Sequence, residues 1–410
     1  MSDIPTEISG WKRTRDLQVI VRNTNKKSYD NKPKTRIAIN TIKRLINADP
    51  NITVLISVPT DVLKEQWMEQ LVSNNILSNC KVEIINSIIK RTWDVDLLVI
   101  DEIHLTASNL MRSIFDVVDY QFILGLTATL ERLDGKEVII KKHCPVIDEI
   151  TIDLATENGW VSTVKEYVVL LDVDLTEYNE WNRKFNGFFA YFDYDFNLAM
   201  KCATDAIYRN KYAKQFKLSV KEIAGVAYGW MQCMKNRKSF VMSHPKKIEI
   251  ARKILDARQD KKCITFSATI KDSEKLAKKG EYVLHSKQSK KQNMIVMDNF
   301  NKASAGVLHS SKAADCGVDI KGLSVGIILS TDSSKIRKTQ RVGRIIRFEE
   351  GKTAELFTIV IKGTQEVYWF QNSATSNYTI INETQLDSIL NGESINTRQR
   401  ENVKNTKFRF

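Results

Sequence analysis

The sequence of 410 residues is poor in glycine, proline and cysteine, and it lacks any long apolar run. With 16 glycines and 6 prolines, it is neither collagen-like nor of low complexity. The six cysteines occur singly, without a C-x-x-C pair, so the spacing of a zinc site is absent and the thiols fit a reducing compartment. No uncharged apolar stretch of about 18 residues occurs, which argues against a membrane span.

The beginning of the chain is not apolar either. Residues 1–10 include Asp3 and Glu7 and lack the apolar segment of a signal peptide. We therefore expect a cytoplasmic or otherwise intracellular protein, in a bacterial or virus-infected cell, rather than a secreted one. The sequence leaves the oligomeric state open, and a monomer is compatible with it.

Acidic residues are fewer than basic ones. There are 49 Asp and Glu against 62 Lys and Arg, which gives a net charge of +13, and 42% of the residues are hydrophobic. Such a chain can form two or three domains with their own cores. The basic excess is greatest over residues 209–253, where 12 Lys or Arg stand against 2 Asp or Glu. Nucleic acid would match this charge, although a solvated basic face has the same composition.

Two stretches, residues 36–130 and 245–362, alternate short apolar runs with amphipathic segments. The apolar runs predict strands over 54–58, 97–100, 122–126, 263–266, 306–309, 325–329 and 356–361. The amphipathic segments predict helices over 61–72, 248–255 and 272–279. Strands that alternate with helices are typical of α/β folds with parallel sheets, so we predict two α/β lobes.

Residues 177–234, between these stretches, have a largely helical pattern and are rich in aromatic side chains. These side chains could stack on bases, but a helix-packing core is the favoured interpretation. They are Phe185, Phe188, Phe189, Tyr191, Phe192, Tyr194 and Phe196. We therefore divide the chain into a first lobe (1–160), a linker strand with a helical basic insert (161–243), a second lobe (244–380) and a polar tail (381–410).

One apolar run ends in two adjacent carboxylates, Asp101 and Glu102, in the segment Leu-Leu-Val-Ile-Asp-Glu-Ile-His of residues 97–104. Open α/β sheets bind their ligands where the strands end. In phosphoryl transfer, the first carboxylate can hold Mg²⁺ and the second can orient and deprotonate the attacking water. Taken alone, the pair could equally be an ordinary acidic turn after a strand.

Two further segments accompany this pair. Residues 125–129 read Gly-Leu-Thr-Ala-Thr, and residues 340–347 read Gln-Arg-Val-Gly-Arg-Ile-Ile-Arg. Arg344 and Arg347 are three positions apart, so on a helix they share a face and can converge on one phosphate. A solvated basic helix is the alternative for the second segment, but it does not explain the order and spacing of all three.

Together these segments resemble the motifs of the DExH-type helicases and translocases of superfamily 2, over residues 15–361. Residues 59–67 resemble motif Ia, 101–104 motif II, 127–129 motif III, 265–268 motif IV, 310–319 motif V and 340–347 motif VI. The segment 125–132 and the helical insert are most similar to the repair and recombination branch, which includes XPB-like proteins and phage UvsW. The resemblance implies two RecA-like lobes, with the nucleotide between them and nucleic acid across both.

The resemblance also implies roles for individual residues, with ATP and Mg²⁺ as cofactors. The implied catalytic residues are Lys34, Asp101, Glu102, Gln340, Arg344 and Arg347. The implied nucleotide contacts are Arg15, Gln18, Lys34, Thr35, Asp101, Gly317, Asp319, Arg344 and Arg347, of which Thr35 and Asp101 would also hold the metal. Nucleic-acid contacts are expected at Thr60, Lys64, Ser87, Ser267 and Ser311, and in the basic run at Lys235, Arg237 and Lys238.

Motif I departs from the family pattern. The matching residues 28–35 read Ser-Tyr-Asp-Asn-Lys-Pro-Lys-Thr, so Lys34 and Thr35 are kept but both glycines of the phosphate loop are absent. Ser28 adds a Cβ where the loop must turn, and Pro33 removes a backbone N–H that could bind phosphate. Weak nucleotide binding is one consequence, whereas the retained Glu102, Arg344 and Arg347 favour an active ATPase.

The expected function is that of an ATP-dependent DNA helicase or translocase that remodels duplex or branched DNA in repair, recombination or replication. One alternative is a helicase-like nucleic-acid-binding protein with impaired ATPase activity. The other is an RNA helicase of similar architecture. DNA is favoured by the resemblance alone, because contacts to the nucleic-acid backbone do not distinguish the sugar.

Overall fold

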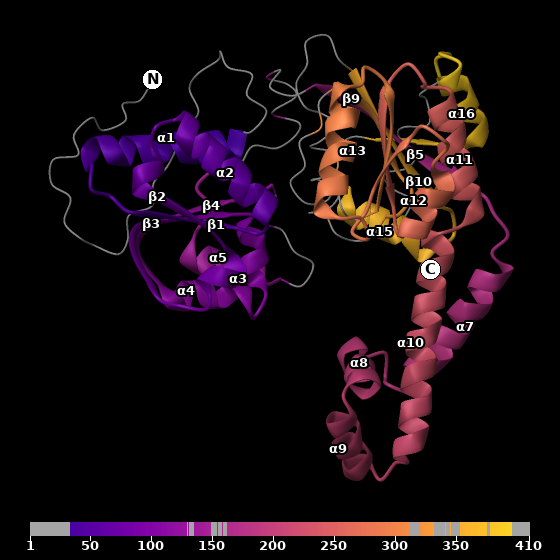
Figure 1. The fold of residues 1–410 in the computed structure, drawn as a ribbon. Helices are drawn as coiled ribbons and strands as arrows, with labels where there is room; N and C mark the ends of the chain where they lie inside the picture. Colours follow the sequence, from indigo (N-terminus) through magenta and orange to yellow (C-terminus); the bar gives the residue numbers. More distant parts are fainter. Residues whose placement is uncertain are drawn as a thin grey trace. The chain divides into compact units, whose positions relative to one another are not determined.

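A computed structural model describes residues 33–128, 130, 135–148, 154, 158, 162–311, 320, 322–331, 341, 345, 353–374 and 378–395 (Figure 1). The chain divides into two compact units. The first is formed mainly by residues up to 163, and the second mainly by residues from 164 onward. Each unit contains a sheet whose strands alternate along the chain with helices, so the predicted division into two α/β lobes is confirmed.

The first unit has a four-stranded sheet in the order β2-β1-β3-β4, and the neighbouring strands are parallel. Its strands are β1 (Val54–Val58), β2 (Cys80–Ile84), β3 (Trp93–Asp101) and β4 (Val118–Leu126). Its helices are α1 (Pro33–Ala48), α2 (Asp61–Ser73), α3 (Ile85–Ile88), α4 (Ile114–Val117) and α5 (Glu137–His143). Three short 3-10 helices cover Leu77–Asn79, Ile103–Ala107 and Met111–Ser113.

The strands of this sheet are apolar on both faces because helices cover both. Along β1, Ile56 packs with α1 and α2 on one face, whereas Leu55 packs with α3 on the other. Successive side chains of a strand point to opposite faces, so each apolar run contributes to two cores. Helix α2 has the predicted stripe, with Trp67 and Leu71 buried and Leu63 partly buried against the same core.

The second unit has a seven-stranded sheet in the order β11-β5-β10-β9-β6-β8-β7. Its strands are β5 (Thr163–Leu171), β6 (Lys262–Ser267), β7 (Tyr282–Leu284), β8 (Gly306–Ser311), β9 (Leu323–Ile328), β10 (Thr353–Ile361) and β11 (Thr379–Ile381). Its helices around the sheet are α11 (Pro245–Asp256), α12 (Ile270–Leu276), α13 (Lys290–Lys302), α15 (Gln365–Ser373) and α16 (Glu383–Leu390). Residues from α11, α12 and α16 share a core with one face, and Phe370 of α15 packs on the other.

Two predicted boundaries need correction in this unit. Residues 163–171, which we expected to form a linker strand outside the second lobe, form β5 inside its sheet and pair in parallel with β11. Residues 383–390, which we expected in a polar tail, form α16, whose Leu386 and Ile389 are buried in the core. The apolar end of residues 163–171 indicates a strand but not the sheet that it joins, and the helix over 383–390 is short. In both cases the sheet of the second unit supplies the surface on which the segment folds.

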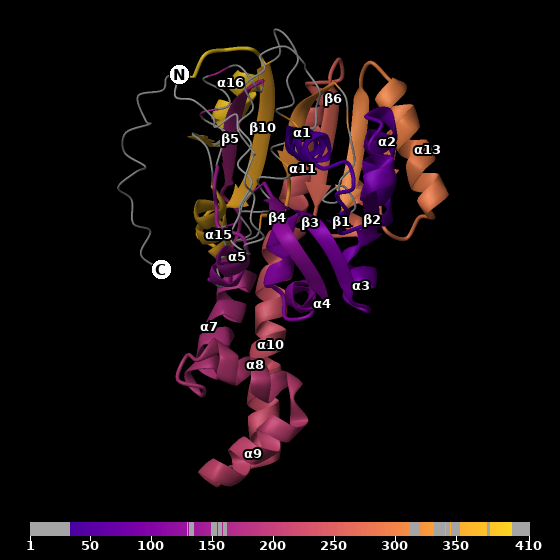
Figure 2. The ribbon, with the colours of Figure 1, turned by 90° about the vertical axis from the view of Figure 1, so that its left-hand side faces the viewer.

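The insert is helical, as predicted, and it has a core of its own. It consists of α7 (Thr176–Ala190), α8 (Phe196–Thr204), α9 (Ala206–Phe216) and α10 (Val220–Met242). Helices α7 and α10 lie side by side, and α8 and α9 pack at the end of α10 that is far from the sheet (Figures 1 and 2). Trp230 is fully buried and contacts the rings of Phe185, Phe189 and Phe196. Most of the predicted aromatic cluster is therefore packing core, whereas Tyr194 and Phe196 are exposed at its edge.

None of the helices in the described parts of the chain combines the length and the apolar character needed to cross a membrane.

Candidate nucleotide site

Three parallel strands of the first unit end at the same edge of their sheet. Thr60 follows β1, Glu102 follows β3 and Thr127 follows β4. Because β1 and β4 both pair with β3 in parallel, the residues after these strands lie close together. The sequence predicted this edge as the site, and the contacts described below are made there.

Asp101 is the last residue of β3 and is buried, with 8% of its surface exposed. Its Oδ2 accepts a hydrogen bond from the indole Nε1 of Trp67 at 3.0 Å, and its Oδ1 accepts one from the backbone N of Glu102 at 3.0 Å. Burial raises the pKa of Asp101, and the charge of Lys34 opposes that rise. Both carboxylate oxygens are therefore oriented by donors before any ligand arrives.

Glu102 has a left-handed backbone conformation, with φ 55° and ψ 50°. This conformation is rare outside glycine and is typical of sites where function requires it. The side chain lies between two partners: Oε1 is 2.8 Å from Lys34 Nζ, and Oε2 is 3.2 Å from His104 Nδ1. Burial alone would raise the pKa of Glu102, but the contact with His104 and the charge of Lys34 lower it to about 2.

His104 connects the carboxylate pair to the next strand. Its Nδ1 also lies 3.0 Å from the hydroxyl oxygen of Thr127, the first residue after β4. The ring is almost fully buried, so both contacts hold it in one position. Thr129, the other threonine of this segment, lies outside the described residues.

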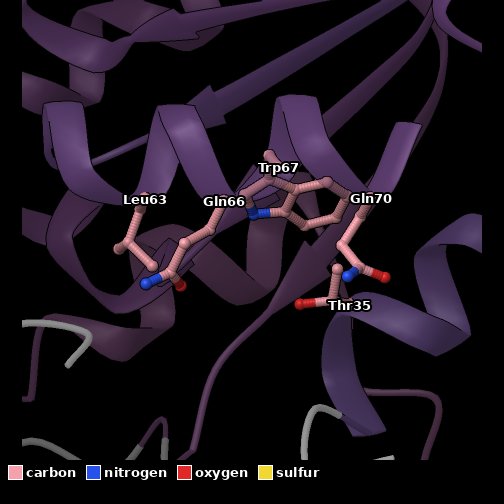
Figure 3. A pocket seen from close by; sticks show the side chains of 5 residues that line it. All are labelled: Thr35, Leu63, Gln66, Trp67 and Gln70. Carbon is pink, nitrogen blue, oxygen red and sulfur yellow. The ribbon is translucent and has the colours of Figure 1, made fainter. Parts of the chain in front are cut away.

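Lys34 and Thr35 begin α1, where backbone N–H groups of the first helical turn have no partner within the helix. Anions bind readily at such a position. Thr35 and Trp67 line a small pocket together with Leu63, Gln66 and Gln70 of α2 (Figure 3). The other residues of the predicted phosphate loop, 28–32, lie outside the described residues.

The oxygen ligands at this site suit Mg²⁺. Thr35 offers a hydroxyl and Asp101 a carboxylate, and both lie beside Trp67. Throughout the described residues, no group of three or more His, Cys, Asp or Glu side chains could hold a metal ion. Mg²⁺ is commonly held by one or two carboxylates together with water and substrate phosphates, so a single carboxylate beside a phosphate site fits this ion.

The expected nucleic-acid contacts of the first unit have different surroundings. Thr60 is the N-cap of α2, and its hydroxyl accepts a hydrogen bond from the backbone N of Leu63. Lys64 Nζ lies 2.9 Å from an oxygen of Glu83, so a phosphate would have to replace this partner. Ser87 is exposed on α3.

In the second unit, Ser267 and Ser311 end the neighbouring strands β6 and β8 and are partners in the parallel register. They are 1% and 4% exposed, and neither hydroxyl oxygen has a hydrogen-bond partner among the residues that the structure describes. A buried hydroxyl without a partner is energetically unfavourable, so each has a free donor and acceptor for a ligand that reaches it.

The three expected contacts on α10 are not equivalent. Lys235 and Lys238 are exposed. The guanidinium carbon of Arg237 instead lies 4.3 Å from the ring centre of Phe185 and 5.7 Å from that of Tyr178. Arg237 therefore contributes to the packing of α7 on α10, through a cation–π contact that its position in a basic run does not reveal.

Several predicted site residues lie outside the described part of the chain. They are Arg15, Gln18, Gly317, Asp319, Gln340, Arg344 and Arg347. One residue of the site was missed as a functional group. Trp67 was predicted on the buried stripe of α2, but nothing in the sequence indicated that its N–H reaches Asp101, which is 34 positions away.

Two family profiles match the chain. Residues 87–132, which contain the carboxylate pair, match the type III restriction enzyme res subunit. Residues 246–349 match the helicase conserved C-terminal domain.

Among solved structures, Saccharomyces cerevisiae Dbp5 bound to RNA and ADP BeF3 aligns with a TM-score of 0.54 at 13% identity, over 89% of this chain and 86% of that one. This likeness shows the fold, two RecA-like domains.

Curated relatives are XPB proteins. The DNA 3'-5' translocase XPB2 of Sulfurisphaera tokodaii is 24% identical over 359 residues, which cover 81% of this chain and 76% of that protein. The general transcription and DNA repair factor IIH helicase/translocase subunit XPB of Schizosaccharomyces pombe is 23% identical over 291 residues. This alignment covers 68% of the chain but only 30% of the yeast protein, so the chain spans less than a third of that relative. These matches support a superfamily 2 helicase that is most like the XPB branch.

Proposed function

We propose that the chain is an ATP-dependent DNA translocase or helicase that remodels duplex or branched DNA in repair, recombination or replication, inside the cell. The observation that carries the proposal is the pair Asp101 and Glu102 at the end of β3, with Lys34 at 2.8 Å from Glu102. A metal-binding carboxylate, a base and a phosphate-binding ammonium are thus gathered at one strand end. The similarity to XPB translocases supports the reaction and DNA as the substrate.

Lys34, Thr35 and Asp101 would hold MgATP in this proposal. Bound Mg²⁺ would neutralise charge on the phosphates during transfer. Lys34 would leave Glu102 for a phosphate oxygen, because a phosphate carries more negative charge than one carboxylate. Arg15, Gln18, Gly317 and Asp319 are further proposed nucleotide contacts, from the resemblance alone.

Glu102 would then act as the base. The pKa of about 2 belongs to the state in which Lys34 is paired with Glu102. Removing that ammonium leaves a mostly buried carboxylate, whose affinity for a proton rises. His104 and Thr127 would keep the carboxylate in place. Gln340, Arg344 and Arg347 are proposed to stabilise the transferring phosphoryl group.

DNA is the proposed partner, held mainly through its phosphates. The proposed contacts are Thr60, Lys64, Ser87, Ser267, Ser311, Lys235, Arg237 and Lys238. The free hydroxyls of Ser267 and Ser311 and the exposed ammonium groups of Lys235 and Lys238 support this assignment. Arg237 could act only after leaving its aromatic neighbours, so we give it the least weight.

Steady-state ATP hydrolysis, measured without nucleic acid and with single-stranded DNA, duplex DNA, forked DNA and RNA, tests this function. We expect hydrolysis that DNA stimulates more than RNA does. Nucleic-acid binding without turnover on any substrate would favour the helicase-like binding protein, and stimulation by RNA alone would favour an RNA helicase. Lys34→Ala is the control, because it removes the phosphate-binding charge.

A further inference from the structure

The indole N–H of Trp67 donates a hydrogen bond to Asp101, the carboxylate that binds the metal in the proposed function. Trp67 is 2% exposed and Asp101 is 8% exposed, and the donor–acceptor distance is 3.0 Å. In Figure 3 the indole projects from α2 toward the start of α1, and Thr35 lies beside it. Trp67 is thus adjacent to both residues that would hold Mg²⁺.

Trp230 and Trp93 show that an indole N–H in this protein need not donate to a carboxylate, although that of the partly exposed Trp181 does, to Glu177 at 3.4 Å. Trp230 is fully buried in the insert, and its Nε1 has no hydrogen-bond partner in the described part of the chain. Trp93 lies at the opposite end of β3 from Asp101, and its Nε1 donates to the backbone oxygen of Ile88 at 3.1 Å. Packing alone therefore does not require the N–H of Trp67 to end on a carboxylate.

The two hydrogen bonds to Asp101 restrict its orientation. One oxygen accepts from Trp67 and the other from the backbone of Glu102, so rotation of the carboxylate would break both bonds. Each carboxylate oxygen has two lone pairs, so each can accept one hydrogen bond and still bind a cation. Partners that orient a metal ligand in this way commonly change metal affinity by about 10- to 100-fold when they are removed.

We infer that Trp67 is a positioning residue, which holds Asp101 in the orientation that binds Mg²⁺ together with nucleotide phosphate. This inference rests on the proposed function for the metal itself. It adds a residue of α2 to the site and predicts a defect that is confined to metal-dependent binding. A residue needed only for packing would weaken nucleotide binding with and without the metal.

The experiment compares the parent, Trp67→Phe and the control Trp93→Phe. Phe keeps an aromatic ring and removes the N–H in both variants. ADP binding is measured by calorimetry in Mg²⁺ and again in EDTA. We expect Trp67→Phe to weaken binding about tenfold in Mg²⁺ and to leave binding in EDTA unchanged. Trp93→Phe should change neither value. Equal loss in both conditions, or no loss in Mg²⁺, would overturn the inference.

A double-mutant comparison with Asp101→Asn tests whether Trp67 acts through Asp101. In that background, Trp67→Phe should cause no further loss of Mg²⁺-dependent binding, and a further tenfold loss would overturn the inference. If Trp67→Phe does not fold, Trp67→Met removes the same N–H with an adaptable apolar side chain and should give the same selective loss.

The role of Trp67 and the proposed ATP-dependent function can fail independently of each other. A parent protein that binds MgADP but never hydrolyses ATP would contradict the function and still allow the comparison. A parent whose ADP affinity is the same in Mg²⁺ and in EDTA would overturn the inference, because no carboxylate would then be binding the metal.

Discussion

The ammonium nitrogen of Lys34 lies 2.8 Å from Oε1 of Glu102, so the residue proposed to hold phosphate is paired with the residue proposed to activate water. The pair neutralises two groups that would each need a different partner during hydrolysis. Despite burial, the contact with His104 and the charge of Lys34 lower the pKa of Glu102 in this state, so the movement of Lys34 to a phosphate would make Glu102 a stronger base. The arrangement therefore links the ability of Glu102 to accept a proton to the presence of nucleotide.

We expect Glu102→Gln to abolish DNA-stimulated ATP hydrolysis, because the amide cannot accept the proton of water. General-base catalysis contributes about 10²- to 10⁴-fold, and turnover should fall by at least that range. Nucleotide binding, measured with a fluorescent ATP analogue, should survive. Glu69→Gln, at an exposed position of α2, is the matched control. Unchanged turnover in Glu102→Gln would remove Glu102 from the role of base.

Pro33 is the first residue of α1 and has no backbone N–H to offer a phosphate. A lost hydrogen bond to a charged group costs roughly 1.5–3 kcal/mol, which is about one to two decades of affinity. We therefore expect Pro33→Gly to bind the fluorescent ATP analogue more tightly. Pro50→Gly, in the loop after α1, is the control for adding a glycine. Equal or weaker binding would mean that residues 28–35 do not follow the path of a phosphate loop.

The affinity for DNA should depend strongly on salt, and Lys235 and Lys238 should account for part of that dependence. Both are exposed, whereas Arg237 between them in sequence is packed on Phe185. We expect Lys235→Gln with Lys238→Gln to weaken binding and to lower the salt slope by about 0.9 for each lysine that contacts a duplex phosphate.

Lys141→Gln with Lys142→Gln removes the same charge from exposed positions of α5 and serves as the control. A salt slope that is equal in the two double variants would assign Lys235 and Lys238 to a solvated surface.

Arg237→Ala is best tested separately, by thermal unfolding, because the loss of its contact with Phe185 should weaken the packing of α7 on α10 and lower the unfolding temperature.

Glu281 of the second unit should make stability depend on pH. Both of its oxygens accept from Arg252, at 2.8 and 2.9 Å, and Oε2 also lies 2.8 Å from His309 Nε2. Burial would raise the pKa of Glu281, but these contacts and the backbone N of Lys278 lower it to about 2. Because the folded-state pKa lies below the ordinary value, the contribution is fully present above about pH 4.5 and is lost toward pH 2.

We expect Glu281→Gln to lower the free energy of unfolding by roughly 1.5–3 kcal/mol at pH 7, as for other lost hydrogen bonds to charged groups, and by less at pH 3. Glu249→Gln removes an exposed carboxylate that pairs with Lys246 on α11, and it should cost less than about 1 kcal/mol. Urea denaturation at both pH values measures the difference. A loss in Glu281→Gln that is the same at pH 7 and pH 3 would contradict the ionic role.

The edge that carries the carboxylates could be predicted because its signal is local. An apolar run that ends in Asp101 and Glu102 defines a strand and its functional end within eight residues of sequence. The stripe of α2 and the strand over 54–58 were predicted on the same basis, from patterns that repeat within one element. Such patterns reflect which face is buried, and burial is what the structure confirms.

The remaining features depend on contacts between distant segments. The bond from Trp67 to Asp101 joins residues from two elements, and no spacing rule connects them. Strand β5 becomes part of the second sheet by lying between β10 and β11, which both follow it in the chain by more than 180 residues. Arg237 has the composition of a basic surface, but the rings of α7 determine where it lies.

Gly125 lies in β4 beside Ile100 of β3, at the end of the sheet that carries the site. A Cβ at this position would come within 2.5 Å of Ile103 Cδ1, in the turn that directly follows Glu102. A larger residue would have to displace the side chain of Ile103, whose Cγ2 would also lie at 3.2 Å, next to the residue proposed as the base. At 24% identity to a translocase, most positions of the chain have been free to diverge. We expect position 125 to tolerate fewer replacements than most, because each larger side chain must first displace Ile103.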